Sequence, residues 1–160
     1  MEYAELMSDF NANLNIEGAS PDADGAYHFE IDGMPVSVME IAELRQAVVW
    51  GDLGEMPPVN CERLYKSMLE AMFMGEGTGG GSFSIDHETG RVYLQRLLPL
   101  VALETADFLS QVERFVNVLE EWRRIIAEYR DVSSEFKDAM GRDDAEQRRA
   151  WLNADGFLRA

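Results

Sequence analysis

One hydrophobic seam dominates the pattern of apolar and polar positions along this chain. Between Thr105 and Tyr129 the apolar residues recur at alternating steps of four and three, which places them along one side of a helix. The seam consists of Phe108, Val112, Phe115, Leu119, Trp122, Ile126 and Tyr129. Further apolar residues between these positions widen it beyond a coiled-coil stripe, so we expect the helix to pack on a sheet or helix of its own domain. Thr105 is the predicted N-cap, and Gly141 is the furthest point at which we expect the helix to end.

Two shorter helices are predicted upstream. Residues 2–14 carry apolar side chains at helical intervals and are expected to form an amphipathic helix. Asn60 can cap another helix that runs to about Met74. The apolar positions of this second helix cover more than one side. A helix of that kind needs two partners, for instance the sheet of its own subunit and a second subunit.

A β-hairpin is predicted where the apolar period changes from 3.6 to 2. Residues 27–31 and 34–38 alternate around Asp32-Gly33, a two-residue turn of the type that hairpins prefer. Alternation on both sides of such a turn is the best hairpin signal in the chain.

Three further strands complete the predicted sheet. One is expected at residues 46–53, and the segment 39–44 before it fits either a strand or a helical turn. A second hairpin is predicted from residues 83–85 and 92–94, which flank a turn with Gly90 in the left-handed region.

The resulting order of elements is helix, three strands, helix, two strands and a long helix. This order predicts an α+β fold, with a five-stranded antiparallel sheet flanked by three helices. Residues 1–140 are expected to form the domain, and residues 141–160 a C-terminal extension that is either a short helix or disordered. The five glycines between Gly75 and Gly81 predict a flexible connection.

The charge balance narrows the classes of partner. Thirty acidic side chains against fourteen basic ones give a net charge of −16. The negative excess is concentrated in the first sixty residues, which hold twelve acids and a single base, Arg45. Such a surface repels phosphate backbones and anionic lipids, so binding to nucleic acid or to a membrane is not expected. A protein partner with basic segments would be attracted.

Few residues are candidates for chemistry. Cys61 is the single cysteine, which excludes an internal disulfide, gives no support to a zinc site and fits a reducing compartment. The two histidines, His28 and His87, do not stand at spacings that chelate a metal or pair with a nucleophile. Asp22 and Asp24 precede a glycine in an order that does not match an EF-hand loop. The sequence therefore predicts no enzyme, no metal site and no cofactor.

A series of short motifs follows the predicted elements. They are Phe10-Asn-Ala-Asn-Leu14, Phe29-Glu-Ile-Asp-Gly33, Val48-Val-Trp-Gly-Asp-Leu-Gly54 before Pro57-Pro58, Leu64-Tyr-Lys-Ser-Met-Leu-Glu-Ala71, Phe83-Ser-Ile-Asp86, Gly90-Arg-Val-Tyr-Leu94 and the long terminal helix. In this order, in a small acidic chain, they resemble the class I type III secretion chaperones of the CesT (Tir chaperone) family. The resemblance covers about residues 1 to 130.

The resemblance implies a homodimeric, ATP-independent chaperone of the bacterial cytoplasm. Such proteins hold the N-terminal part of a secreted effector in extended form, keep it soluble and deliver it to the secretion apparatus, whose ATPase is a further expected partner. In the family the first helix and exposed sheet positions bind the effector. The matching residues here would be Tyr3, Leu6, Met7, Phe10, Phe29, Val36 and Val38. The second helix and the adjoining strand form the dimer interface, which here would comprise Leu64, Tyr65, Met68, Leu69, Met72, Phe83 and Ile85.

A second hypothesis comes from a different class. An acidic regulatory or anti-activator protein would sequester a basic partner through the first sixty residues. Salt separates the two hypotheses, because a charge-driven complex should dissociate well below about 1 M salt whereas an apolar complex persists.

Overall fold

The computed structural model describes residues 2–16, 19–57, 61–101 and 103–141, with side chains up to residue 131. Its helices are α1 (Tyr3–Asn13), α2 (Cys61–Met72) and α3 (Thr105–Gly141), with short 3₁₀ turns η1 (Ala42–Leu44) and η2 (Phe73–Gly75). Its strands are β1 (Tyr27–Ile31), β2 (Met34–Ile41), β3 (Gln46–Glu55), β4 (Ser82–Ile85) and β5 (Arg91–Pro99). The predicted α+β class and order of elements are confirmed.

The five strands form one antiparallel sheet in the order β1-β2-β3-β5-β4, so β1 and β4 are its edges. The first hairpin forms as predicted. Ile31 pairs with Met34, and Asp32 and Gly33 between them both have positive φ, as a two-residue type I′ turn requires. The ambiguous segment 39–44 contains both alternatives in succession, because β2 continues to Ile41 before the 3₁₀ turn η1.

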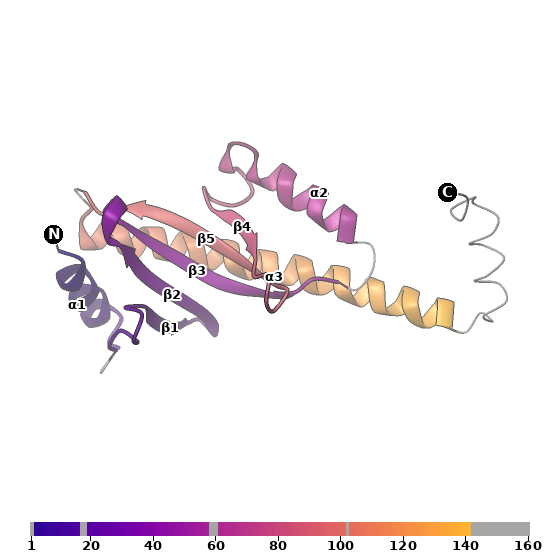
Figure 1. Ribbon diagram of the computed structural model, residues 1–160, viewed down its shortest axis with the longest axis horizontal. Coiled ribbons are helices and arrows are strands. Elements are labelled where there is room, and N and C mark those ends of the chain that lie inside the picture. The colour runs from indigo at the N-terminus through magenta and orange to yellow at the C-terminus, as the bar shows by residue number, and fades with distance from the viewer. Residues whose placement is uncertain (1, 17–18, 58–60, 102, 142–160) are drawn as a thin grey trace.

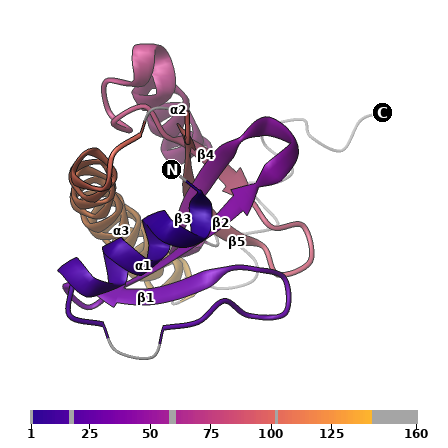
Figure 2. The same cartoon turned by 90° about the vertical axis from the view of Figure 1, so that its left-hand side faces the viewer.

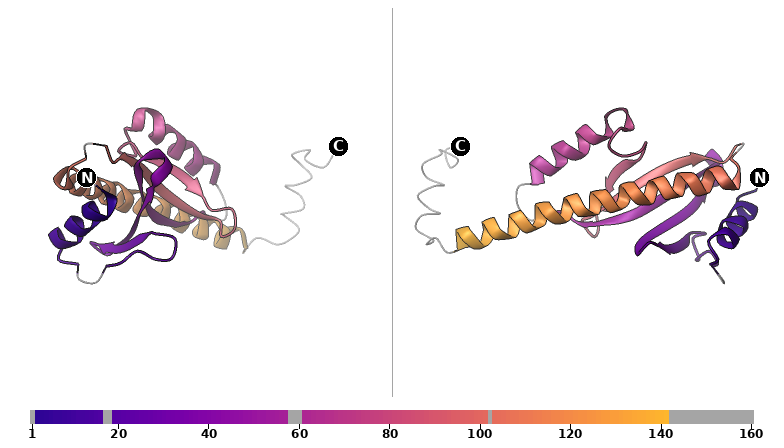
Figure 3. Two further views of the ribbon diagram at one scale, coloured as in Figure 1. Left: turned by 60° about the vertical axis from the view of Figure 1, so that its left-hand side comes forward. Right: turned by 180° about the vertical axis from the view of Figure 1, so that it is seen from behind.

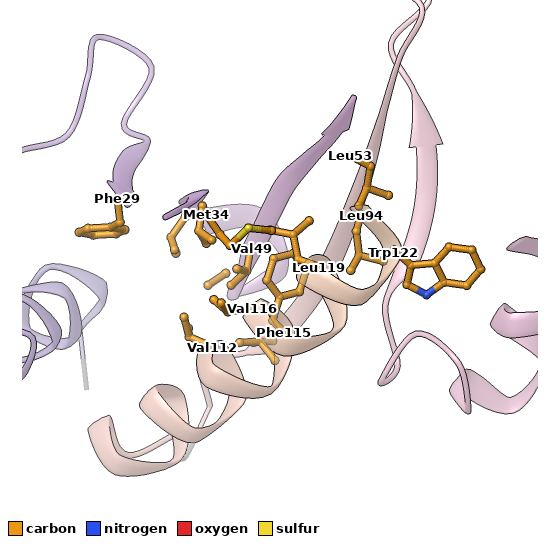
Figure 4. Packing of buried hydrophobic residues seen from close by; sticks show 14 of the residues in the cluster. Phe29, Met34, Val49, Leu53, Leu94, Val112, Phe115, Val116, Leu119 and Trp122 are labelled. Atoms are coloured by element: carbon orange, nitrogen blue, oxygen red, sulfur yellow. The ribbon is translucent and has the colours of Figure 1, made fainter. Parts of the chain in front are cut away.

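One face of the sheet carries α1 and α3, whereas the opposite face carries no helix among the described elements (Figures 1 and 2). The apolar seam of α3 turns towards the sheet. Six of its seven residues are buried, and Tyr129 at its end is half-buried. Figure 4 shows Val112, Phe115 and Leu119 on the side of α3 that faces Val49 and Leu94 of the sheet. The predicted packing of the long helix on a sheet of its own domain is therefore confirmed.

Gly51 on β3 lets α3 approach the sheet closely. A Cβ built at this position would lie 2.3 Å from Cδ2 of Leu119, far inside van der Waals contact. The small residue therefore leaves the space that the leucine fills.

Helix α1 closes one end of the core. Its buried residues are Leu6, Met7 and Phe10. The ring of Phe10 makes edge contacts with Phe29 of the sheet and with Phe108 of α3, with centroid distances of 5.2 Å in both cases. This ring joins the first helix, the sheet and the long helix in one core.

Two helix starts can be compared with their predicted caps. Helix α3 begins at Thr105 itself, and the Phe108 amide donates to the Glu104 carbonyl at 2.9 Å, so the cap position is one residue earlier than predicted. Asn60, the predicted cap of α2, lies outside the described residues, as do residues 142–160 of the predicted C-terminal extension.

The glycine-rich segment is not the flexible connection that its composition predicts. Thr78 is buried, and its hydroxyl donates to the Gly81 carbonyl at 2.7 Å. The indole N–H of Trp122 donates to the Gly77 carbonyl at 2.8 Å. One of these hydrogen bonds lies within the loop and the other holds it against α3, and composition alone reveals neither.

Candidate protein-binding surfaces

The free edge strand β1 has a hollow at each end. The hollow at its start, of about 310 Å³, is lined by Tyr3, Ala4, Pro21, Asp24, Gly25, Tyr27, Met39 and Glu40. The hollow at its end, of about 320 Å³, lies between α1, β1 and α3 and is lined by Phe10, Leu14, Ile31, Asp32, Leu109, Val112, Glu113, Val116 and Asn117. We call these the β1-start hollow and the β1-end hollow. Each has an apolar lining with two acidic residues.

The residues assigned to effector binding by resemblance lie mostly inside the protein. Leu6, Met7, Phe10, Phe29, Val36 and Val38 are all buried in the core. The expectation that they form exposed patches is corrected, because the apolar side of α1 and the inner face of the first hairpin pack against each other and against α3. Only Phe10, in the lining of the β1-end hollow, and Tyr3 remain next to a hollow.

Tyr3 is half-buried at the β1-start hollow. Its hydroxyl donates to the carbonyl of Val38 at 3.2 Å, and its ring makes an edge contact with Tyr27. Burial raises the pKa of the Tyr3 hydroxyl above its usual value. The hydroxyl therefore stays protonated and fixes the first turn of α1 to the sheet.

Other residues of the two hollows were not among the predicted effector contacts. Leu14, Ile31 and Leu109 surround the β1-end hollow, and Leu14 remains partly exposed. All three stand at the margin of an apolar pattern in the sequence. This marginal position is the one sequence signal that could have identified them as lining a hollow, because apolar residues at the margin of a pattern border a core without being enclosed by it.

Helix α2 has apolar residues on two sides, as predicted, and the two sides have different surroundings. Leu64 and Met68 are buried within the protomer, whereas Tyr65 and Leu69 are exposed. The helix stands beside the β4 edge and projects from the body of the molecule (Figures 1 and 3). One of the two partners predicted for α2 is therefore the core of its own protomer.

The remaining predicted dimer residues lie near the junction of α2 and β4. Phe83 and Met72 are half-buried, and the Phe83 ring packs edge-on against Trp122 at a centroid distance of 4.7 Å. Ile85 is exposed. Phe73 and Met74, which were not in the predicted set, are the most exposed of the large apolar side chains that the structure describes, at 74% and 81%.

We define the α2 outer surface by its five exposed apolar residues. They are Tyr65, Leu69, Phe73, Met74 and Ile85. Large apolar side chains left exposed in this number are a feature of surfaces that contact another polypeptide.

The helix-free face of the sheet has a third hollow, of about 400 Å³. It is lined by Met39, Val48, Trp50, Ser84, Ile85, Asp86, Tyr93 and Gln95. Met39 and Val48 are cross-strand partners, so the apolar part of this face follows the alternation of the strands.

His28 lies between a carboxylate and a hydroxyl. Its Nδ1 is 2.8 Å from the Ser37 hydroxyl, and its Nε2 is 2.8 Å from Asp22. The hydrogen bond to His28 lowers the pKa of the Asp22 carboxyl, together with one from the Ala26 amide. Ser37 is the cross-strand partner of His28, a contact that spacing along the sequence does not indicate.

This arrangement nevertheless lacks a second requirement of acyl transfer. Strand β2, which carries Ser37, pairs with β1 on one side and β3 on the other. Its amides therefore serve the sheet and do not converge on the hydroxyl as oxyanion donors would. We interpret the three residues as a tether that holds the turn before β1 against the sheet.

Within the described part of the chain, no three histidine, cysteine, aspartate or glutamate side chains are grouped so that they would hold a metal ion. Among the same residues, no helix has the length and apolar character needed to cross a membrane.

Comparison with known proteins identifies the family. The model of the Tir chaperone protein (CesT) family matches residues 5–123. The chain belongs to this family. The family and the fold are those of non-enzymatic secretion chaperones. No curated protein matches the chain.

Solved structures of similar fold are chains of protein complexes. A chain of the HopA1–SchA chaperone–effector complex matches with a TM-score of 0.61 and 19% identity, over 79% of this chain and 93% of that chain. A chain of the ExsC–ExsE complex matches with a TM-score of 0.64 and 18% identity, over 76% and 91%. The Yersinia pestis type III secretion chaperone SycH, in complex with a fragment of YscM2, gives 0.60 and 18%, over 76% and 99%. At these identities the likeness establishes the fold.

Proposed function

We propose that this CesT-family chain is a type III secretion chaperone that binds the N-terminal region of a secreted effector in extended form. The observation that carries the proposal is the edge strand β1, which pairs with β2 alone among the described strands and has a partly apolar hollow at each end. The family match over residues 5–123 and the chaperone–effector complex among the similar structures support it. In this function the chain keeps its effector soluble and competent for secretion, without catalysing a reaction.

Strand addition to β1 is the proposed binding mode. An extended segment that pairs with β1 gains main-chain hydrogen bonds, and its alternate side chains point towards the helix-covered face. At the two ends of β1 these side chains would enter the hollows beside Tyr27 and Ile31. A short helix of the effector can then lie along the groove between α1 and α3.

The charges of the hollows narrow the kind of segment that fits. Asp24 and Glu40 line the β1-start hollow, and Asp32 and Glu113 line the β1-end hollow. An effector segment with apolar residues at alternate positions and Lys or Arg beside them would match both the apolar lining and the acidic rim.

A homodimer built through the α2 outer surface completes the proposed assembly. Its core would consist of Leu69, Phe73 and Met74, with Tyr65 and Ile85 around them. Of the residues assigned to this interface by resemblance, Leu64 and Met68 pack into the core of their own protomer. Met72 and Phe83 are half-buried, between that core and the exposed side of α2. Delivery to the secretion apparatus and its ATPase, in the bacterial cytoplasm, completes the proposal.

Co-expression with the N-terminal fragment of a candidate effector tests the proposal. We expect a soluble complex that survives about 1 M salt, because its contacts are mainly apolar. Ile31→Asp at the β1-end hollow should weaken binding about tenfold or more, as the loss of an interface hot spot does. Leu97→Asp, on the helix-free face, is the matched control and should bind like the wild type.

Equal binding by the Ile31→Asp and Leu97→Asp variants would contradict strand addition at β1. Complete dissociation at moderate salt would favour the second candidate, an acidic regulatory protein that sequesters a basic partner. The observation that favours this candidate is the excess of acidic over basic residues in the first sixty positions, twelve against one.

A further inference from the structure

Two arginines lie beside the glycine-rich loop on the helix-covered side of the sheet. Arg96 on β5 is half-buried, and Arg114 on α3 is exposed. A Cβ built on Gly80 would lie 3.8 Å from Nε and 3.9 Å from Cζ of Arg96, so the guanidinium packs against this glycine. A Cβ on Gly79 would lie 3.3 Å from Val118, one turn along α3 from Arg114. The loop, β5 and α3 therefore converge around the two arginines.

Neither arginine has an acidic partner within the described side chains. Lys66, Arg91 and Arg124 form ion pairs with neighbouring carboxylates, whereas none of the described acids pairs with Arg96 or Arg114. Burial, and after it the charge of Arg114, lowers the pKa of Arg96 below its usual value. A half-buried cation beside a second cation is unfavourable until an anion reaches both.

The loop that packs against Arg96 leads to the α2 outer surface. The Gly80 amide donates to the Gly75 carbonyl at 3.1 Å, so the loop returns to the end of η2, where Phe73 and Met74 are exposed. Glu76 is the next residue of the loop and is also exposed. Among the described residues, no ion pair involves its carboxylate.

We propose that Arg96 and Arg114 bind the Glu76 carboxylate of a second copy of this chain. The inference rests on the homodimer of the proposed function. In a two-fold interface each contact occurs twice, so Glu76 of either copy reaches the arginines of the other. Glu76 lies in the loop that packs against Arg96, so a two-fold axis close to that loop would bring Glu76 of one copy to Arg96 of the other.

Charge complementarity supports a carboxylate of the same chain as the ligand. Each copy has a net charge of −16, and two such copies repel each other. A guanidinium can hold a carboxylate through two parallel hydrogen bonds, which also fixes the orientation of the partner. Two symmetric ion pairs would offset the repulsion at the place where the apolar surfaces meet.

Sedimentation equilibrium of the full-length chain tests the assignment through a charge exchange. Glu76→Arg and Arg114→Glu should each raise the dimer dissociation constant about tenfold or more, because close interfacial charge pairs couple strongly. The double variant, with the two charges exchanged, should recover most of the affinity. Arg96→Glu should behave like Arg114→Glu, with circular dichroism as the check that this half-buried position still allows folding.

Arg45→Glu is the matched control. Arg45 is exposed beside η1, and its replacement changes the net charge by the same amount as Arg114→Glu. Its dissociation constant should stay that of the wild type.

Three results would overturn the assignment. If the wild type is a dimer and the Glu76 and Arg114 variants have the same dissociation constant, the proposed ion pair is wrong and the homodimer stands. Single variants that weaken the dimer without recovery in the double variant would show that Glu76 is not the ligand. A wild type that is monomeric at every concentration would remove the homodimer as well, while effector binding would still be decided by the co-expression experiment.

Discussion

Helices α2 and α3 are both apolar on more than a narrow stripe, and they differ in what covers them. The seam of α3 is enclosed by the sheet, and Leu119 in its centre is fully buried. On α2, Leu69 is 64% exposed although it is equally apolar. The difference shows that an apolar pattern indicates how many sides of a helix are to be covered, and not which polypeptide covers them. The uncovered side is where a partner is expected.

The largest expected loss of stability comes from a substitution in the enclosed seam of α3. Leu119→Ala leaves a cavity between α3 and β3, and should lower the free energy of unfolding by about 2 to 5 kcal/mol. Urea denaturation at a fixed protein concentration measures it, since dimerisation makes stability depend on concentration. A loss below about 0.5 kcal/mol, the range of ordinary surface substitutions, would contradict the enclosed seam.

Gly51→Ala tests the same contact from the strand. Its added methyl group would meet the Leu119 side chain at 2.3 Å, and overpacking of this kind should cost about 1 to 3 kcal/mol. The double variant Gly51→Ala/Leu119→Ala should be more stable than the sum of the two single losses predicts, because the clash and the cavity relieve each other. Strict additivity in urea denaturation would argue against this close approach.

Trp122→Phe tests the attachment of the glycine-rich loop, which follows α2, to α3. The substitution removes the hydrogen bond from the indole N–H to the Gly77 carbonyl and should cost about 0.5 to 1.5 kcal/mol. Hydrogen exchange by mass spectrometry should show faster exchange in residues 75–81, with β1 and β2 as the internal control. Uniform acceleration over both regions would indicate that the bond is not a local attachment.

The smallest effect on the fold is expected at the exposed side of α2. Leu69→Ser should change the free energy of unfolding by less than about 0.5 kcal/mol at a concentration where the chain is monomeric. Urea denaturation at that concentration provides the measurement. A loss as large as that of Leu119→Ala would mean that Leu69 belongs to the core of one protomer.

Features with a local period were predictable from the sequence. The seam of α3 and the hairpin around Asp32-Gly33 depend on spacing and on turn residues within a few positions of one another, and both were found as predicted. The position of Gly51 opposite Leu119 depends on how the sheet meets the helix, which neighbouring residues do not specify.

The candidate binding surfaces were predicted less completely, for a related physical reason. Phe29, Val36 and Val38 have the alternation of a strand with one apolar face, whether a helix of the same chain or a partner covers that face. The structure places them under α1 and α3. Arg96 lies on a strand and Arg114 on a helix. Their proximity therefore depends on how the helix packs on the sheet, and no spacing in the sequence predicts it.

The most direct test of the central claim, that the α2 outer surface is covered by a second copy, is the mass of the chain in solution. Sedimentation equilibrium should give twice the chain mass of 18.1 kDa for the wild type and a single chain mass for Leu69→Glu/Phe73→Glu. A monomeric wild type, or a dimer that persists when both charges are introduced, would contradict it.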